Sequence, residues 1–325
     1  MRDQLPTQRL LGAALAALCV VLGALVLTPA CAEESPAAPA PAAAPAYTPK
    51  GADTCLKCHD DAALLGLFRT AHGRPTDARS PFGHGQLQCE ACHGPGDAHA
   101  RGKGKNRPPL IRFGHKSGTP VPTQNEQCLA CHRGTNAHWQ GNAHAANDLS
   151  CADCHRAHSA EDPVRKVATQ PEICTGCHLA KRTDELKPSH HPLLEGKMAC
   201  TACHAAHGST APAQLVKHTT TELCTSCHTE YRGPFVWEHA PVTEDCSLCH
   251  QPHGSTQPSL LKTRPPFLCQ ECHEAQGHPS VPYTPDGLPG GGGPQRGAFL
   301  AARGCVNCHS QVHGSNHPSG SKLMR

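Results

Sequence analysis

Ten copies of one short motif, two cysteines separated by two residues and followed directly by a histidine, run through most of the chain. The cysteines are Cys55, Cys58, Cys89, Cys92, Cys128, Cys131, Cys151, Cys154, Cys174, Cys177, Cys200, Cys203, Cys224, Cys227, Cys246, Cys249, Cys269, Cys272, Cys305 and Cys308. The histidines are His59, His93, His132, His155, His178, His204, His228, His250, His273 and His309. Two thiols one helical turn apart can form thioethers with two vinyl groups while the adjacent histidine reaches the iron, so the motif is typical of covalent haem c attachment. We therefore expect ten haem c groups.

Zinc is the alternative chemistry for such cysteine pairs, because two pairs can supply the four ligands of a structural zinc site. Ten motifs would then make five zinc ribbons. That interpretation leaves unexplained why a histidine follows every second cysteine. The two cysteines outside the motifs, Cys19 and Cys31, lie in the N-terminal segment, so no cysteine of the mature chain is left over for a disulfide.

Further histidines are candidates for the second axial ligand of each iron. A recurring unit of motif, lone histidine, motif and closing histidine picks out ten of them. The candidates in the middle of a unit are His72, His144, His191, His239 and His278, and those at the end of a unit are His99, His158, His207, His253 and His313. Ten candidates match ten irons, so we predict bis-histidine haems and no catalytic residue.

The order Cys-His-x-x-His recurs at His158, His207 and His253. At that spacing the second histidine cannot easily fold over the ring bound by the first, so we expect it to bind a neighbouring haem and join two units. Methionine is scarce in the mature chain, which argues against Met/His ligation and its higher reduction potential. The alternatives that stay open are His190 for His191, His138 for His144 and His317 for His313. We interpret six histidines as solvated loop residues: His84, His115, His138, His190, His218 and His317.

The elements that must position these residues are expected to be short. Aromatic residues make up 3% of the chain, against 31 prolines and 30 glycines, so side chains alone can hardly offset the conformational entropy lost on folding. We predict a multihaem cytochrome c fold, in which mostly irregular chain with short α-helices and little or no β-structure wraps a chain of ten haems. The five di-haem units span approximately 55–99, 128–158, 174–207, 224–253 and 269–313.

The N-terminus has the pattern of an export signal. Arg2 and Arg9 precede an apolar stretch, and Ala30-Cys31-Ala32 offers a cleavage site, so we expect residues 1–32 to be a signal peptide. An uncleaved membrane anchor, or a lipid on Cys31, is the alternative. Export to an oxidising compartment favours haem over free thiols or zinc. Residues 33–50 are expected to be a Pro/Ala-rich linker and 51–325 a decahaem domain, and the net charge of +3 is too small to indicate nucleic-acid binding.

The residues resemble the periplasmic decahaem cytochromes of the MtrA, PioA and DmsE type. Besides the ten motifs and their spacing, the resemblance is carried by residues 68–73, 92–99, 189–192 and 312–320, and it covers about residues 51–325. The short linker is closest to the MtrA and DmsE size class.

This resemblance implies an elongated wire of two pentahaem halves that carries electrons across the outer membrane inside a β-barrel porin. It implies an extracellular multihaem cytochrome or terminal reductase as one partner and a periplasmic or inner-membrane cytochrome as the other. The expected location is the periplasm, in association with the outer membrane, and the expected role is extracellular electron transfer. A soluble periplasmic shuttle that feeds a reductase is the alternative function, and a multihaem reductase is the third.

Overall fold

The structure, a computed structural model, describes residues 44–273 and 304–324. The predicted signal peptide, most of the predicted linker and His278 lie outside these residues. The α-helices are α1 (Ala52–Cys55), α2 (Ala62–Leu65), α3 (Glu90–His93), α4 (Asp97–Arg101), α5 (Val121–His132), α6 (Ala143–Ala146), α7 (Cys151–Cys154), α8 (Gln170–Thr175), α9 (Leu179–Glu185), α10 (Thr220–Thr225), α11 (Ala240–Glu244) and α12 (Phe267–Gln270). The 3-10 helices are η1 (Gly66–Arg69), η2 (Gly104–Asn106), η3 (Gly134–Asn136), η4 (Pro163–Arg165), η5 (Cys200–Ala202), η6 (Pro212–Gln214), η7 (Thr229–Tyr231), η8 (Cys246–Leu248), η9 (Pro258–Leu260) and η10 (Cys305–Asn307).

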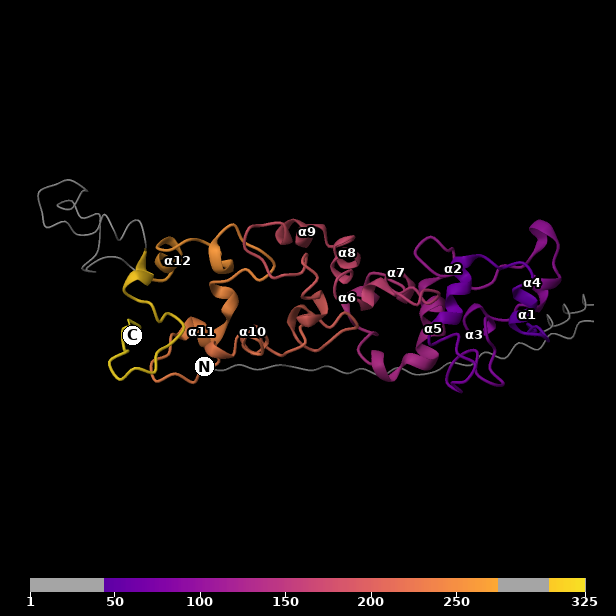
Figure 1. The fold of residues 1–325 in the computed structure, drawn as a ribbon, viewed down its shortest axis with the longest axis horizontal. Helices are drawn as coiled ribbons and strands as arrows, with labels where there is room; N and C mark the ends of the chain where they lie inside the picture. Colours follow the sequence, from indigo (N-terminus) through magenta and orange to yellow (C-terminus); the bar gives the residue numbers. More distant parts are fainter. Residues whose placement is uncertain (1–43, 274–303, 325) are drawn as a thin grey trace, which may run out of the picture. The chain divides into compact units, whose positions relative to one another are not determined.

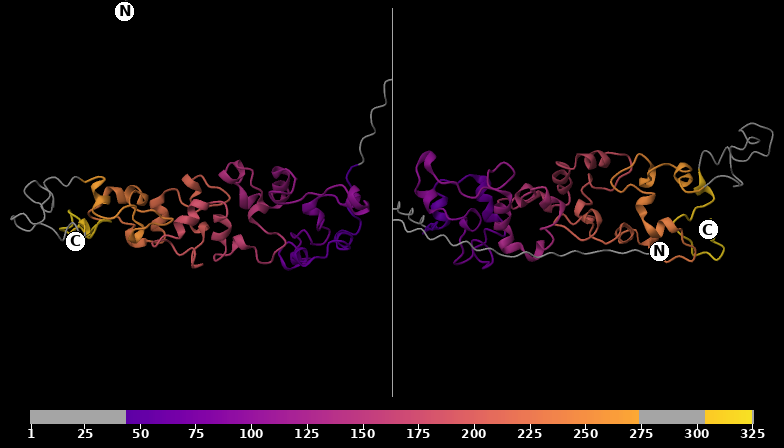
Figure 2. Two further views of the ribbon diagram at one scale, coloured as in Figure 1. Left: turned by 90° about the horizontal axis from the view of Figure 1, so that it is seen from above. Right: turned by 180° about the vertical axis from the view of Figure 1, so that it is seen from behind.

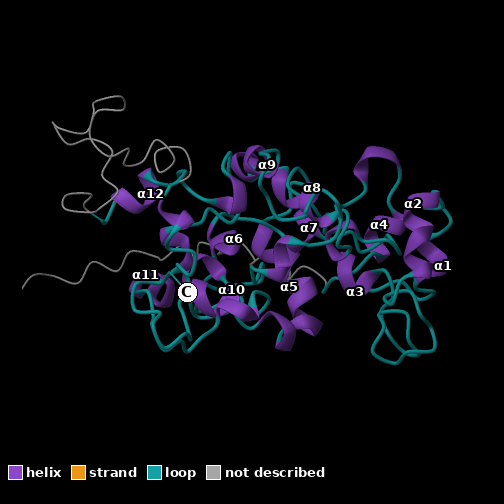
Figure 3. Cartoon of the chain, turned by 60° about the vertical axis from the view of Figure 1, so that its left-hand side comes forward, coloured by secondary structure: helices purple, strands orange, loops and turns teal. Residues whose placement is uncertain are grey.

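Short helices and irregular chain make up the described residues, as the composition predicted (Figure 3). These residues form no strand; their β-type pairing consists of isolated bridges, such as that between Ser189 and Ser255. The expected fold class, short helices in irregular chain with little or no β-structure, is confirmed. Within the described ranges, none of the helices has the length and apolar character needed to cross a membrane.

Each motif forms one helical turn. In nine motifs the backbone N–H of the histidine donates to the carbonyl of the first cysteine, as from His155 to Cys151 over 2.9 Å, and the tenth motif lies inside α5. This i to i+4 bond turns both cysteines toward one side. Local capping begins several of these turns: the side chain of Ser150 and that of Asp153 form a capping box at the start of α7.

Neighbouring repeats contact one another in sequence order within the compact unit Pro45–Arg325 (Figures 1 and 2). Ser189 and Ser255 exchange backbone hydrogen bonds between two successive units, and Trp237 and Ser315 do the same further along the chain. Gly254 allows one of these contacts to be close. It has φ +150°, and a Cβ there would lie 1.9 Å from the carbonyl oxygen of Asp184, so only glycine fits.

Few apolar side chains are buried in the described residues. They are Ala52, Leu67, Trp139, Leu193 and Ala199. Polar residues fill more of the interior: the buried carboxylate of Glu90 accepts from the backbone N–H of Thr48 at 3.0 Å and from that of Gly96 at 2.6 Å. The last residues of the predicted linker, from Pro45 onward, therefore pack with the motifs.

We expect the chain to lose its fold when haem is not attached. So small an apolar core cannot offset the entropy of ordering the backbone, which costs roughly 1–2 kcal/mol per residue. The chain made in cells that lack cytochrome c maturation should show a disordered far-ultraviolet circular dichroism spectrum and no cooperative urea transition, whereas the haem-loaded chain should show one. A cooperative transition in the haem-free chain would contradict this.

Candidate haem-binding sites

Nine motif histidines each face a second histidine from elsewhere in the chain. The distances between ring centres all lie between 5.9 and 6.5 Å. The pairs, motif histidine first, are His59–His99, His132–His72, His93–His158, His178–His144, His155–His207, His228–His191, His204–His253, His273–His239 and His250–His313. The tenth motif histidine, His309, is described, while the remaining candidate, His278, lies outside the described residues.

The spacing of the rings fits two imidazoles on opposite sides of one iron. A metal–nitrogen bond is about 2 Å long and the nitrogen lies about 1 Å from the ring centre, so two such ligands have ring centres about 6 Å apart. The separation stays in this narrow range although the angle between the ring planes varies from 11° in His204–His253 to 89° in His132–His72. The observed 5.9–6.5 Å therefore matches the separation that a shared metal ion requires.

The pairs exchange histidines between successive units. A mid-unit histidine reaches forward to the first motif of the next unit, as His144 does to His178. An end-of-unit histidine reaches back to the second motif of the preceding unit, as His207 does to His155. At the N-terminal end of the array, His99 faces His59 of its own unit. The second histidine of each Cys-His-x-x-His sequence thus lies beside the preceding unit's motif.

Hydrogen bonds at Nδ1 orient one ring in most of the pairs. His144 donates from Nδ1 to the carbonyl of Ala206 at 3.0 Å, His191 to that of Pro252 at 2.8 Å, and His239 to that of Val312 at 2.9 Å. Each acceptor directly precedes an end-of-unit histidine, so the same contact positions both exchanged side chains. Because Nδ1 is occupied by its proton, Nε2 is the atom left to bind a metal.

Burial keeps several of the second histidines neutral. It lowers the pKa of five of them, and the paired motif histidine lowers each further; they are His72, His158, His207, His253 and His313. The neutral imidazole is the form that binds a metal ion, so this environment suits ligation.

The neighbouring histidines left open by the sequence lie in different places. His190 donates from Nδ1 to the carbonyl of Lys187 and contacts the Glu195 carboxylate through Nε2, and both bonds raise its pKa. His191, not His190, faces His228.

The choices between His138 and His144 and between His313 and His317 are resolved in the same way. His144, not His138, faces His178, and His313, not His317, faces His250. The Nδ1 of His317 instead accepts a hydrogen bond from the backbone N–H of Ser319.

Cysteine sulfurs of the two motifs within a unit lie side by side. The thiols stand in for the thioether sulfurs of the haem-loaded chain. Burial and the neighbouring Cys55 raise the pKa of the Cys89 thiol to about 11, and burial and Cys246 raise the pKa of Cys224 to about 12. The same contact joins the first cysteines in the other units: Cys128–Cys151, Cys174–Cys200 and Cys269–Cys305.

The second cysteine of the second motif in a unit lies near the sulfurs of the next unit. Burial and the nearby sulfurs of the next unit raise the pKa of Cys92, Cys154, Cys203 and Cys249. Their neighbours are, in the same order, Cys131, Cys177, Cys227 and Cys272. Neighbouring motifs therefore lie near one another in sequence order, both within the units and from one unit to the next.

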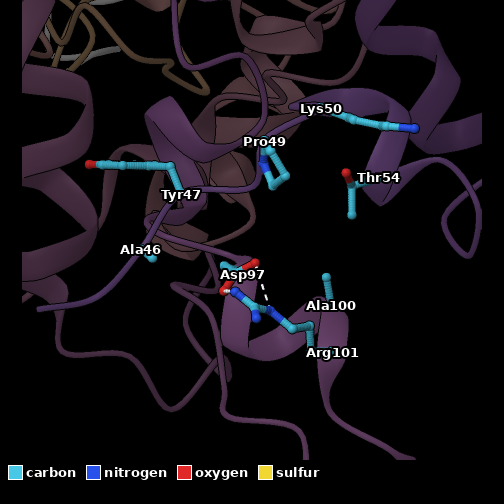
Figure 4. Close-up of a pocket in the computed structure, with 8 residues that line it drawn as sticks. All are labelled: Ala46, Tyr47, Pro49, Lys50, Thr54, Asp97, Ala100 and Arg101. Carbon is cyan, nitrogen blue, oxygen red and sulfur yellow. Dashed lines mark hydrogen bonds and ion pairs between the residues drawn. The ribbon is translucent and has the colours of Figure 1, made fainter. Parts of the chain in front are cut away.

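One cavity of about 600 Å³ lies beside the first motif and is lined by Tyr47, Lys50, Thr54, Asp97 and Arg101 among others (Figure 4). The guanidinium of Arg101 pairs with the Asp97 carboxylate at its edge. None of the predicted cysteine or histidine ligands lines it. The chemistry of the site therefore resides in the histidine pairs and the sulfurs.

Sequence reasoning missed the acceptors of the Nδ1 protons. Most of them are backbone carbonyls, which no residue type signals. One is a side chain, Asp162, whose Oδ2 accepts from the Nδ1 of His155 at 2.7 Å. Its signal in the sequence is an acidic residue shortly after a motif.

Known proteins with similar sequences share the cysteine motifs. The family described as "Doubled CXXCH motif" matches residues 190–233 and 239–278, and the family "Cytochrome c-type protein NrfB-like" matches residues 89–170. The "Multiheme cytochrome MtrA" of Shewanella baltica (strain OS185) is 44% identical over 282 residues, which are 86% of this chain and 83% of that protein. The solved "Undecaheme cytochrome from S-layer of Carboxydothermus ferrireducens" is 18% identical, with 74% of this chain and 33% of that chain covered, and its TM-score of 0.12 is too low to indicate a common fold.

The motifs, the facing histidines and the extent of the sequence identity lead to one conclusion about relationship and cofactor. The chain belongs to the MtrA-type multihaem c-type cytochromes, and it is an electron-transfer protein with covalently attached haem c.

Proposed function

We propose that this chain is the haem-bearing part of an electron conduit across the outer membrane, with ten bis-histidine haems. The nine histidine pairs would hold nine of the irons, and His309 with His278 would hold the tenth. Haem c, when bound, supplies a one-electron iron(III)/iron(II) couple. The polypeptide would hold the attachment points in order and supply two histidines to each iron.

The observation that carries the proposal is that neighbouring motifs lie close together in sequence order. Within a unit the first cysteines of the two motifs lie side by side, and between units the exchanged histidines face the motifs of the neighbouring unit. Consecutive attachment points are thus neighbours from the first motif to the last, as a path for electrons through the length of the chain requires.

The proposed location, in the periplasm and across the outer membrane, rests on the N-terminal export signal and on the irregular backbone. Residues 1–32 direct the chain to the periplasm, where haem c is attached. An irregular backbone in lipid leaves polar groups unsatisfied, so the chain crosses the outer membrane only inside a protein sheath, for which a β-barrel porin is suited. An extracellular multihaem cytochrome or terminal reductase exchanges electrons at one end, and a periplasmic or inner-membrane cytochrome at the other.

A soluble periplasmic shuttle uses the same haems and the same export signal. It differs only in lacking the barrel, so location separates it from the conduit. A reductase would need an iron with an open axial position. The facing histidine at each of nine motif histidines speaks against that function.

Replacing His191 by alanine should open one iron. We expect His191→Ala to convert about one tenth of the haem from low-spin to high-spin and to make that fraction bind carbon monoxide after reduction, because the ligand opposite His228 is lost. The absorption spectrum with and without carbon monoxide measures this fraction.

His190→Ala is the matched control, because it removes the adjacent imidazole. It should leave all haem low-spin and unreactive. Carbon monoxide binding in the His190 variant but not in the His191 variant would contradict the assignment.

The conduit itself is tested by location. We expect the tagged native chain to separate with the outer membrane and to co-purify with a large β-barrel in mild detergent. Haem staining of the two fractions and mass spectrometry of the co-purified protein measure this. Haem-stained chain found wholly free in the periplasm would establish the shuttle instead.

A further inference from the structure

The second motif histidine of every unit donates from Nδ1 to an acceptor in the following loop. In four units the acceptor is a backbone carbonyl, at 2.6–2.9 Å. These donor–acceptor pairs are His93–Ile111, His204–Ala213, His250–Ser259 and His309–Lys322. In the unit 128–158 the acceptor is the carboxylate of Asp162, which lies 2.7 Å from the Nδ1 of His155.

The loop after His155 explains the difference. In two units the carbonyl acceptor lies nine positions after the histidine, at Ala213 or Ser259, and both of these residues have positive φ. Asp162 lies seven positions after His155. Because the segment between the histidine and its acceptor is shorter here, a side chain rather than a backbone carbonyl reaches the ring nitrogen.

Asp162 is held firmly in this position. Its side chain is 12% exposed, and its Oδ1 accepts from the backbone N–H of Arg156 at 3.2 Å while Oδ2 accepts from His155. Among the described residues, His155 is its only ion-pair partner, whereas the adjacent Glu161 pairs with Lys166. The negative charge of Asp162 is therefore directed at the imidazole.

In the described part of the chain, one other carboxylate lies near the Nδ1 of a motif histidine. Glu230 Oε1 is 3.6 Å from His228 Nδ1, which is beyond hydrogen-bond distance, and its side chain is 58% exposed. Water and ions screen a charge in that position. Glu230 is thus a natural control for a carboxylate that is close to a ligand but neither bonded to it nor buried.

A bonded carboxylate changes what the imidazole gives to the iron. It attracts the Nδ1 proton more strongly than a carbonyl does, and so makes Nε2 a better electron donor. A buried negative charge also stabilises the more positive oxidation state of a nearby metal. Both effects favour iron(III) over iron(II), while the proton stays on Nδ1 and no bond forms or breaks.

We propose that Asp162 is a positioning residue that lowers the reduction potential of the haem held by Cys151, Cys154, His155 and His207, relative to the haems whose ligands donate to carbonyls. The inference rests on the bis-histidine ligation proposed above. It makes the fourth motif a low-potential step within the array.

The test uses the full, haem-loaded chain with Asp162→Asn, which keeps the shape and the acceptor oxygen but removes the charge. We expect about one tenth of the haem absorbance to titrate at a more positive potential in spectroelectrochemistry. The shift should be at least about tenfold in the equilibrium constant for reduction, which is about 59 mV for a one-electron couple. Asp162→Ala, which removes the acceptor as well, should shift the same fraction at least as far.

Two controls separate this inference from the ligation on which it depends. Glu230→Gln should leave the titration unchanged, and His207→Ala should make about one tenth of the haem bind carbon monoxide. Superimposable titrations of the Asp162 variants and the unmodified chain, with an open haem in His207→Ala, would overturn the role of Asp162 alone. No open haem in His207→Ala would overturn the ligation.

Discussion

The structure depends on pairs of imidazoles held about 6 Å apart, nearly all of them between residues of different units. Described apolar side chains are mostly exposed or half-buried, and those fully buried are few. The pairs instead add long-range contacts, because each spans many residues of sequence, as from His93 to His158. A metal bond at such a pair joins two units that have little apolar surface with which to hold one another.

The exchange of histidines explains why the units follow one another in order. An inner unit gives one histidine forward and one back and receives one from each neighbour, so its own haem sites are complete only when its neighbours are folded. Stability in such arrays comes from neighbour contacts as much as from the repeat itself. His99, which faces His59 of the same unit, closes the N-terminal end of the array without a preceding unit.

The sequence predicts the local structure well because the motif determines its own turn. The bond from the histidine N–H to the first cysteine carbonyl needs only the spacing of the motif. Pairing is harder to predict, since His190 and His191 are adjacent and only folding shows that Glu195 and Lys187 bind the former. The repeat pattern favoured His191, and the structure places it beside His228, but no rule of spacing required this.

A substitution affects a side-chain acceptor of the histidine Nδ1 proton differently from a backbone acceptor. A carbonyl such as that of Ala213 accepts the Nδ1 proton of His204 whatever side chain the residue carries, provided that the loop keeps its conformation. Substitution therefore changes little at those ligands. At His155 the acceptor is a side chain, so a single substitution changes the charge without moving the backbone. In a fold built almost wholly from backbone and ligands, such a position is where sequence variation can adjust one haem and leave the others as they are.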